Sequence, residues 1–170
     1  PKSLAVIGAG AIGLELAQAF TRLGVEVTLF NRDKRVAGLK DEDINNKAID
    51  CLSREMTMHL GSKINDVGQQ AADNEGSAAF IDYEDSAGET RQWQGDYVLV
   101  ATGRRNNIAA LGVENLGVGL DDKNRPKQLD KKTGKIGNLE VYIVGDANAN
   151  LPLLHVASDE GFSAGSMVCN

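Results

Sequence analysis

Three glycines near the start of the chain, Gly8, Gly10 and Gly13, have a spacing that suits the binding of a pyrophosphate. In a Gly-x-Gly-x-x-Gly turn the first glycine permits a tight turn, the second lets the backbone approach the phosphates, and the third lets the following helix pack closely on the preceding strand. The phosphates would lie on the unpaired amides and the positive dipole end of that helix. We therefore expect the whole turn to contact a ligand: Gly8, Ala9, Gly10, Ala11, Ile12 and Gly13.

The elements on either side of these glycines have the required types. The apolar run 3–7 predicts a strand, and the run 14–20, with helical apolar spacing, predicts a helix. A glycine pattern set between a strand and a helix is a dinucleotide-binding fingerprint, although the 19 glycines of the chain also allow a turn of purely structural value. The sequence therefore predicts NAD(P)(H) as a cofactor.

A second predicted strand, 25–30, leads to the residues that would recognise the adenosine ribose. The position usually acidic in NAD-binding units is Asn31, which cannot repel a 2′-phosphate. Arg32 and the cations that follow it could attract such a phosphate through charge-assisted hydrogen bonds, so this segment favours NADP(H). Two alternatives stay open: Asp33 could turn inward and bind the ribose, or the cations could form a solvated surface.

The middle of the chain predicts one more helix and a small antiparallel sheet. Asp41 can cap a helix running to about residue 60, in which Cys51 falls in an apolar pattern and is expected to be buried. Three short strands follow, at 63–67, 78–83 and 89–93, separated by turn signals. They predict a three-stranded β-meander.

A nearly continuous apolar strand is predicted at 97–105, of the kind that is buried on both faces of a parallel sheet. Within it, the bare backbone of Gly103 would let a cofactor come close. A second buried strand, 141–147, runs into Gly-Asp, and a helix-like segment, 154–161, follows it. The fold class expected is α/β: a Rossmann-like parallel sheet with helices on one face and the β-meander on the other.

In this order of elements the chain resembles the flavin-dependent pyridine nucleotide–disulfide oxidoreductases. The resemblance spans essentially the whole chain and rests on the glycine fingerprint, the Ala-Thr-Gly-Arg that ends the strand at 101–104, and the later Gly-Asp segment. It implies that residues 1–115 form the NAD(P)-binding domain. Residues 116–170 would then be the C-terminal segment of a split FAD-binding domain, incomplete in this chain.

The resemblance also assigns roles to further residues. Asp146 would bind the ribitol chain of FAD, and the segment beside the flavin would be Pro152, Leu153, Leu154 and His155. Glu15 would lie near the contact of nicotinamide and flavin and pair with a lysine of the FAD domain, or else only compensate the helix dipole. Val67 would lie beside the adenine, or be an ordinary core valine.

Two branches of the family match different parts of the chain. The Gly-Asp segment with its Leu-His-x-Ala-x-x-Glu-Gly continuation, and Glu15, are similar to dihydrolipoamide dehydrogenases, which generally carry glutamate at the position of Asn31. Arg32 is more similar to the NADPH-dependent glutathione and mercuric reductases. We expect a dihydrolipoamide dehydrogenase-like parent that exchanges hydride between NAD(P)H and FAD, coupled to a dithiol and a disulfide.

No catalytic residue is expected in this chain, because the family's redox cysteines (CxxxxC) and its acid–base His-Glu pair fall outside it. The chain alone should therefore be inactive. It would need the rest of the FAD domain and the dimerisation domain as partners, in a parent that is a homodimer. Two other readings are a non-catalytic dinucleotide-binding module and a flavoprotein reductase without the disulfide.

Composition excludes several other classes. The net charge of −6 over 170 residues argues against nucleic acid as a partner, and no apolar run approaches the length of a membrane span. The two cysteines, Cys51 and Cys169, are too far apart for a CxxC pair, and no metal-ligand spacing is present. A cytoplasmic location follows as the default expectation.

Overall fold

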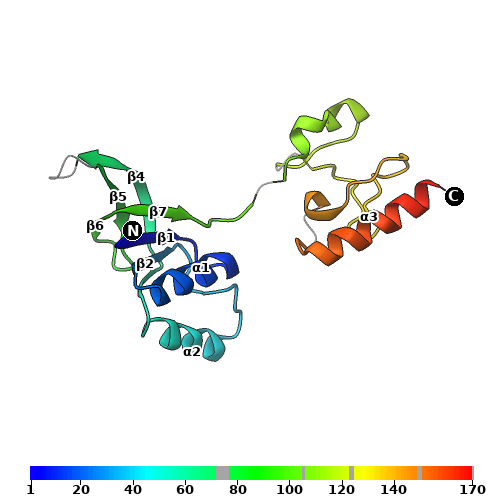
Figure 1. Cartoon of the computed structure of the whole chain (residues 1–170). Helices are drawn as coiled ribbons and strands as arrows, with labels where there is room; N and C mark the ends of the chain where they lie inside the picture. The colour runs from blue at the N-terminus through cyan, green and yellow to red at the C-terminus, as the bar shows by residue number, and fades with distance from the viewer. Residues whose placement is uncertain (72–76, 105, 123–124, 149–150, 170) are drawn as a thin grey trace. The chain divides into compact units, whose positions relative to one another are not determined.

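The computed structural model of the chain describes residues 1–170 except 72–76, 105, 123–124, 149–150 and 170. The chain forms two compact units, Pro1–Gly103 and Arg104–Asn170, each with its own core (Figure 1). The two compact units meet at 103–104, and the domain boundary at 115–116 stays a prediction. We describe the units as unit 1 and unit 2.

Unit 1 is built on a parallel sheet of four strands in the order β3-β2-β1-β7. The strands are β1 (Ser3–Ile7), β2 (Glu26–Asn31), β3 (Thr57–Leu60) and β7 (Tyr97–Val100). Helix α1 (Ala11–Arg22) connects β1 to β2, and helix α2 (Glu42–Leu52) lies between β2 and β3. The order of strand, glycine turn, helix and strand is the one that the fingerprint predicts.

The second sheet of unit 1 is the expected antiparallel meander, in the order β4-β5-β6. Its strands are β4 (Lys63–Ala71), β5 (Ser77–Glu84) and β6 (Thr90–Gly95). β4 and β5 cover the predicted segments 63–67 and 78–83 and extend beyond them, and β6 begins one residue later and ends two residues later than the predicted segment 89–93. The α/β fold class, with a Rossmann-like sheet and a β-meander, is confirmed.

The two faces of the parallel sheet are covered by different layers because successive strand residues point to opposite sides. Leu4, Val6 and Leu29 pack in a core on the side of α1 and α2. Ala5 and Phe30 pack on the other side in a core with residues of the meander. The sheet is thus a central layer, as expected, with helices on one face and the meander on the other (Figure 1).

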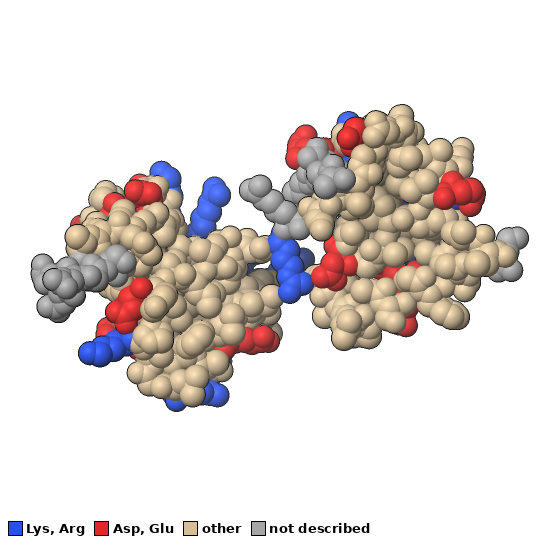
Figure 2. Space-filling model, turned by 45° about the horizontal axis from the view of Figure 1, so that its top comes forward, with Lys and Arg blue, Asp and Glu red and all other residues tan. Residues whose placement is uncertain are grey.

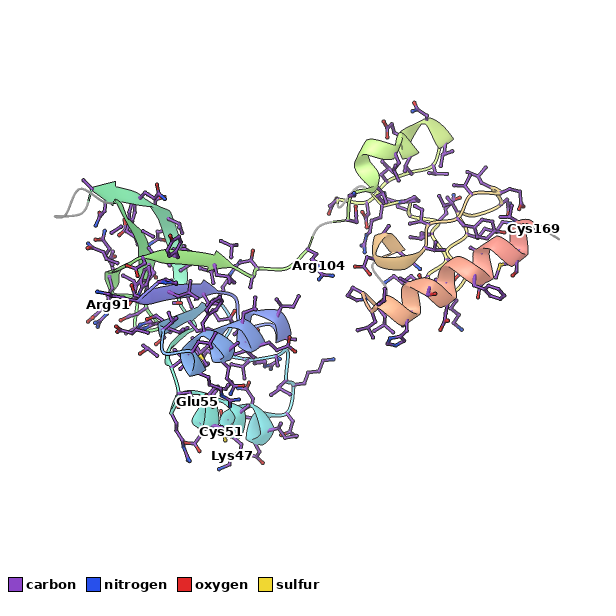
Figure 3. All side chains as sticks on the ribbon, in the orientation of Figure 1. Lys47, Cys51, Glu55, Arg91, Arg104 and Cys169 are labelled. Carbon is purple, nitrogen blue, oxygen red and sulfur yellow. The ribbon has the colours of Figure 1, made fainter. Side chains whose placement is uncertain are left out.

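The predicted helix 41–60 is too long. Asp41 caps α2 as expected, its carboxylate accepting a hydrogen bond from the backbone N–H of Ile44 (3.0 Å), but the helix ends at Leu52. Residues 57–60 form β3 instead, because the exposed edge of β2 offers backbone partners to a short segment that the helical pattern also fits. Cys51 is exposed, beside Lys47 on the outer side of α2 (Figure 3), so its predicted burial is wrong.

The predicted strand 97–105 is also shorter and less buried than expected. Strand β7 covers only 97–100 and lies at an edge of the sheet, where it pairs with β1 alone. Tyr97 and Val100 are 63% and 66% exposed. An apolar run predicts a strand but does not tell how many neighbours the strand has, and that number decides its burial.

Unit 2 has three short 3-10 helices, η1 (Ile108–Leu111), η2 (Val113–Leu116) and η3 (Gly145–Asn148), and a terminal helix α3 (Leu154–Val168). The buried side chains of its core, among the residues that the structure describes, are Ile108, Val113, Ile136 and Ile143. The strand predicted at 141–147 is not formed; only an isolated antiparallel bridge joins Tyr142 to Lys135. A strand requires a continuous partner, and the segment has none among the described residues of unit 2.

The surface carries both signs of charge. On the face shown in Figure 2, lysine and arginine side chains are interspersed with carboxylates over both units. Among the described residues, no helix has the length and apolar character needed to cross a membrane.

Candidate functional site

The glycine turn between β1 and α1 has the geometry that a pyrophosphate site needs. Gly8 has φ +112°, and a Cβ atom there would lie 2.5 Å from the carbonyl oxygen of Ala101. A Cβ at Gly13 would overlap the carbonyl oxygen of Gly8, so α1 can approach the turn only because position 13 has no side chain. A Cβ at Gly10 would meet nothing within 4 Å. Gly10 thus leaves open space over the turn, where a ligand can approach the backbone.

The helix that follows the turn presents free backbone donors to this space. Gly10 is the N-cap residue of α1 and provides no side-chain cap. The first intrahelical bond runs from the N–H of Leu14 to the carbonyl oxygen of Gly10 (3.0 Å). The amides of the first turn therefore have no partner within the helix and can donate to an anion, which the helix dipole also favours.

Glu15 lies in the second turn of α1 and is exposed. The first turn of the helix contains no acidic residue. Compensation of the dipole in that turn is therefore not the role of Glu15, and its carboxylate is available to a partner.

Beside the turn lies a hollow of about 390 Å³ at the carboxyl ends of the parallel strands. An adjoining hollow of about 600 Å³ is lined by Gly61 and by the residues that follow β2, with Asn31 and Arg32 common to both. Ligands of open α/β sheets bind at this end of the strands. The first hollow is lined by Ile7, Gly8, Phe30, Asn31, Arg32, Ser62, Ile64 and Thr102.

Five of these lining residues were not predicted as site residues from the sequence: Ile7, Phe30, Ser62, Ile64 and Thr102. Ser62 and Thr102 come just after β3 and β7, so their positions at the strand ends could have identified them once β3 was recognised. Ser62 is buried, and its hydroxyl donates to the carbonyl oxygen of His59 (2.8 Å). Ile64 comes from the meander and contributes an apolar wall.

Asn31 is the last residue of β2, and its side chain is hydrogen-bonded to the glycine turn. Its Oδ1 accepts a hydrogen bond from the backbone N–H of Ala9 (3.1 Å). The neighbouring N–H of Gly8 donates to the carbonyl oxygen of Phe30 (2.8 Å). Arg32 follows with an exposed side chain at the mouth of both hollows.

Two further predicted contacts, Val67 and Gly103, lie in unit 1. Val67 pairs with the buried Ile81 in the meander, so both side chains are on the face directed to the parallel sheet. Val67 is nevertheless 42% exposed, which leaves it open to a ligand rather than in the core. Gly103 has φ +108°, and a Cβ there would meet nothing within 4 Å.

An aromatic group lies under the hollow. The rings of Phe30 and His59 stack with centroids 5.1 Å apart, and Tyr83 packs edge-on against Phe30 at 4.9 Å. Burial lowers the pKa of the His59 imidazole, and the charge of Arg91 lowers it further, while Asp85 opposes both. His59 lies in β3 and not in a helix, and its ring packs against Phe30, which lines the hollow.

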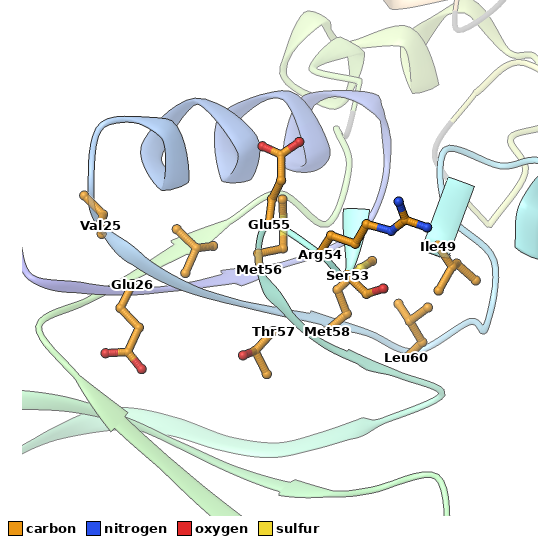
Figure 4. A pocket seen from close by; sticks show the side chains of 11 residues that line it. Val25, Glu26, Ile49, Ser53, Arg54, Glu55, Met56, Thr57, Met58 and Leu60 are labelled. Atoms are coloured by element: carbon orange, nitrogen blue, oxygen red, sulfur yellow. The ribbon is translucent and has the colours of Figure 1, made fainter. Parts of the chain in front are cut away.

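A different hollow, of about 590 Å³, opens at the opposite ends of the strands (Figure 4). Glu26 and Thr57, the first residues of β2 and β3, line it together with Met56 and Ile49. Glu55 at its rim binds the guanidinium of Arg22 (2.9 Å). This end of the sheet lacks the glycine turn and the free amides of α1, so we do not assign the nucleotide to it.

In unit 2 the predicted flavin-contacting residues form an exposed group. Asp146 lies in η3 with its side chain 55% exposed, and its carboxylate accepts from Arg104 at 3.2 Å (Arg104 is labelled in Figure 3). The backbone N–H of Gly145 donates to Glu160 of α3 (2.8 Å), which fixes η3 to that helix. The segment that leads into α3 is exposed throughout: Pro152, Leu153, Leu154 and His155. Among the described residues, no cluster of side chains could hold a metal ion.

With this geometry established, comparison with known proteins defines the class. Residues 1–161 match the family model described as pyridine nucleotide-disulphide oxidoreductase. The chain belongs to that family.

The relatives are whole enzymes of which the chain spans about a third. A mitochondrial dihydrolipoyl dehydrogenase of Dictyostelium discoideum is 33% identical over 96% of the chain and 33% of its own length. Dihydrolipoyl dehydrogenase 3 of Pseudomonas putida is 36% identical over 94% of the chain and 33% of its length. A mercuric reductase of Staphylococcus aureus is 35% identical over 95% of the chain and 28% of its length.

Solved structures agree on the fold. The crystal structure of LpdA from Mycobacterium tuberculosis matches with a TM-score of 0.78 and 25% identity, over 99% of this chain and 35% of that one. The flavoprotein disulfide reductase RclA of Escherichia coli, 22% identical with a TM-score of 0.75, has the same fold over 94% of this chain and 34% of its own.

Proposed function

We propose that this chain is the nicotinamide dinucleotide-binding part of a flavoprotein disulfide oxidoreductase, of which a dihydrolipoamide dehydrogenase is the best candidate. The observation that carries the proposal is the glycine turn. Gly8 and Gly13 let α1 pack closely on β1, because a Cβ atom at either position would overlap a backbone carbonyl oxygen. Gly10 leaves the unpaired amides at the start of α1 accessible to an anion.

The residues of the chain would orient the coenzyme. Backbone amides at the start of α1 would donate to the pyrophosphate, and Ile64 and Val67 would provide apolar surface for the adenosine end. Open backbone at Gly103 and the exposed carboxylate of Glu15 would lie toward the reacting end. The bound coenzyme supplies the hydride; the chain holds it in one geometry, which is a large part of what such a site contributes.

In unit 2, Asp146 would accept hydrogen bonds from hydroxyl groups of FAD in the complete enzyme. Its carboxylate is exposed and held by Arg104, and the glycine before it is tied to α3. The exposed apolar side chains of Leu153 and Leu154, 46% and 89% exposed, would be covered by the flavin and the rest of its domain. Residues 116–170 would thus belong to a split FAD domain in a homodimeric parent that depends on cysteines outside this chain.

At the adenosine end we propose a preference for NADP(H). Asn31 is neutral, and Arg32 lies at the mouth of both hollows with an exposed guanidinium. An arginine can bind a 2′-phosphate by charge-assisted, bidentate hydrogen bonds, whereas a ribose hydroxyl gives it no charge to pair with. This feature supports a second candidate, an NADPH-dependent reductase similar to the mercuric reductase, in place of a dihydrolipoamide dehydrogenase.

Calorimetric titration tests both parts of this proposal. The protein that carries this chain is titrated with NADPH and separately with NADH at one ionic strength. We expect NADPH to bind at least about tenfold more tightly, a difference of about 1.4 kcal/mol. Tighter binding of NADH would overturn the NADP(H) preference and favour the dihydrolipoamide dehydrogenase, and binding of neither would refute the dinucleotide function.

The part played by Asp146 is tested separately by the flavin content of the purified protein. Asp146→Asn removes the charge and keeps the shape, so we expect weaker retention of FAD. Asp159→Asn, at an exposed position of α3, is the matched control. Equal FAD content in the two variants would contradict the assignment of Asp146.

A further inference from the structure

The segment between β2 and α2 is held in place by side-chain amides from two elements. We call residues 32–37 the coenzyme loop. The Nδ2 group of Asn31 donates to the carbonyl oxygens of Asp33 (2.9 Å) and Arg35 (3.0 Å). Its Oδ1 accepts from the N–H of Ala9 in the glycine turn. The orientation of this amide is fixed by its partners, because the N–H of Ala9 can only donate and the two carbonyls can only accept.

A second asparagine secures the loop from the side of α2. Asn45 is buried, and its Oδ1 accepts from the N–H of Val36 (2.9 Å). Its Nδ2 donates to the carbonyl oxygen of Lys34 at 3.5 Å. The side chain of Val36 is fully buried in the core, and the N–H of Ala37 donates to the carbonyl oxygen of Ala9 (2.8 Å).

The acidic residue of the loop is also used within it. The Oδ1 of Asp33 accepts from the backbone N–H of Arg35 (3.1 Å), which closes a local turn. Both hydrogens of the Asn31 amide are committed to carbonyls. The single acceptor oxygen of Asn31 already receives the N–H of Ala9, so Asn31 cannot accept from two ribose hydroxyls as a carboxylate would, and one oxygen of Asp33 is engaged within the loop.

Arg32 differs from its neighbours in this respect. Its side chain is exposed at both hollows, and no ion pair holds it among the described residues. Because the backbone on either side is fixed by the amides, the guanidinium extends from a rigid base. Binding a ligand group to Arg32 therefore costs less conformational entropy than binding it to an arginine on a loop that must first become ordered.

We propose that Asn31 is a positioning residue for coenzyme choice: its amide closes the coenzyme loop and so presents Arg32 to a 2′-phosphate, without contacting the ribose itself. The inference rests on the proposed dinucleotide function and deepens it. A carboxylate at position 31 could accept from Ala9 but could not donate to the carbonyls of Asp33 and Arg35. The exposed position of Arg32 thus depends on a neutral amide at position 31, which can both accept from Ala9 and donate to the two loop carbonyls.

The test uses 2′,5′-ADP and 5′-AMP as probes of the adenosine end in the whole protein that carries this chain, with affinities measured at one ionic strength. We expect 2′,5′-ADP to bind about tenfold more tightly than 5′-AMP. Arg32→Gln should reduce this ratio to about twofold or less, and Asn31→Ala should do the same although Arg32 is still present. Arg35→Gln, in the same loop but not lining either hollow, should keep the wild-type ratio.

A second measurement examines the loop without any ligand. Trypsin can cut after Arg32, Lys34 and Arg35, and cleavage there reports how often the loop opens. We expect Asn31→Ala to be cut at least about tenfold faster than wild type, because three hydrogen bonds are lost. Arg32→Gln, scored at the two remaining sites, and Asn46→Ala, at an exposed position of α2, should be cut at the wild-type rate.

The outcomes separate the two hypotheses. An Asn31→Ala variant that lowers both affinities alike and keeps their ratio would show a merely structural residue and overturn the inference. A lowered ratio with unchanged cleavage would mean that Asn31 contacts the ligand directly, which also overturns it. Wild-type protein that binds both probes equally refutes the role of Arg32 but leaves dinucleotide binding intact, whereas wild type that binds neither probe nor NAD(P)H refutes the proposed function itself.

Discussion

Replacing Gly13 by alanine tests the packing on which the site depends. The new Cβ would overlap the carbonyl oxygen of Gly8 and lie 3.1 Å from its carbonyl carbon and 3.3 Å from the Cβ of Ala101. The overlapped atom is backbone and cannot rotate away, so α1 must move outward. That movement loosens Leu14 and Ala17, which are buried against the sheet.

The size of the effect follows from two opposed contributions. Overpacking of this kind costs about 1–3 kcal/mol, and a backbone overlap lies at the upper end of that range. Alanine in place of glycine within a helix returns up to about 1 kcal/mol. We therefore expect a net loss of about 2 kcal/mol, which for a unit of this size lowers the melting temperature by about 10 °C.

The matched control is Gly10→Ala. Gly10 has φ −72° and ψ 176°, which alanine adopts without strain, and its Cβ would meet nothing within 4 Å. Losing glycine at the N-cap lowers the free energy of unfolding, whereas the smaller entropy of the unfolded chain with alanine raises it. The two contributions offset each other within about 1 kcal/mol. Gly10→Ala should therefore keep the stability of the wild type but weaken NAD(P)H binding, because the methyl group occupies the space where the pyrophosphate approaches.

Both variants are measured by thermal unfolding and urea titration without added coenzyme, since a bound ligand would raise the apparent stability. Calorimetric titration then gives their affinities. A melting temperature of Gly13→Ala within about 2 °C of wild type would refute the packing argument. A destabilised Gly10→Ala with wild-type affinity would refute the division of roles between the glycines.

Three further outcomes test the core, a helix cap and a titrating group. Phe30→Ala, which removes a fully buried ring in contact with His59 and Tyr83, should cost about 3–5 kcal/mol in urea unfolding; a loss below 1 kcal/mol would contradict the assigned core. Asp41→Ala should cost about 1 kcal/mol because the N–H of Ile44 loses its cap, and Asp43→Ala, which removes a first-turn charge but no cap, should cost less. Burial lowers the pKa of His59 in the folded state, so the unfolded chain takes up a proton first as the pH falls. The contribution of the neutral imidazole to folding stability is therefore complete above about pH 6.5, and it is lost as the pH drops through the folded pKa. The urea midpoint should therefore decline more steeply between about pH 7 and 5 in wild type than in His59→Phe, and equal slopes would exclude this group as a cause.

The glycine turn could be predicted from the sequence because its chemistry is local. A strand, three spaced glycines and a helix occupy consecutive positions, and the roles of Gly8 and Gly13 follow from backbone geometry over six residues. The meander could be found for a similar reason, since each of its turns lies between two adjacent strands. Helix α3 also formed where the pattern 154–161 indicated a helix.

Three predictions of secondary structure failed because they depended on neighbours distant in sequence. Residues 57–60 fit a helix by pattern, but the open edge of β2 turned them into β3. Strand β7 has the apolar run of a central strand and lies at an edge, because nothing in its own residues specifies a second neighbour. The segment 141–147 has strand character, but in the described part of unit 2 only a single bridge, between Tyr142 and Lys135, pairs with it.

The sequence alone predicted the class of ligand, because a glycine fingerprint between a strand and a helix places unpaired amides at the start of that helix. Only the tertiary structure decided what the residues after β2 do. In the sequence Arg32 could attract a 2′-phosphate, while Asn31 or an inward-turned Asp33 could instead bind the ribose. Folding brings Ala9 and the carbonyls of the coenzyme loop within hydrogen-bond distance of Asn31, and the N–H of Arg35 within reach of Asp33. Those contacts engage the amide of Asn31 and one carboxylate oxygen of Asp33 within the loop, and they leave the guanidinium of Arg32 exposed at both hollows.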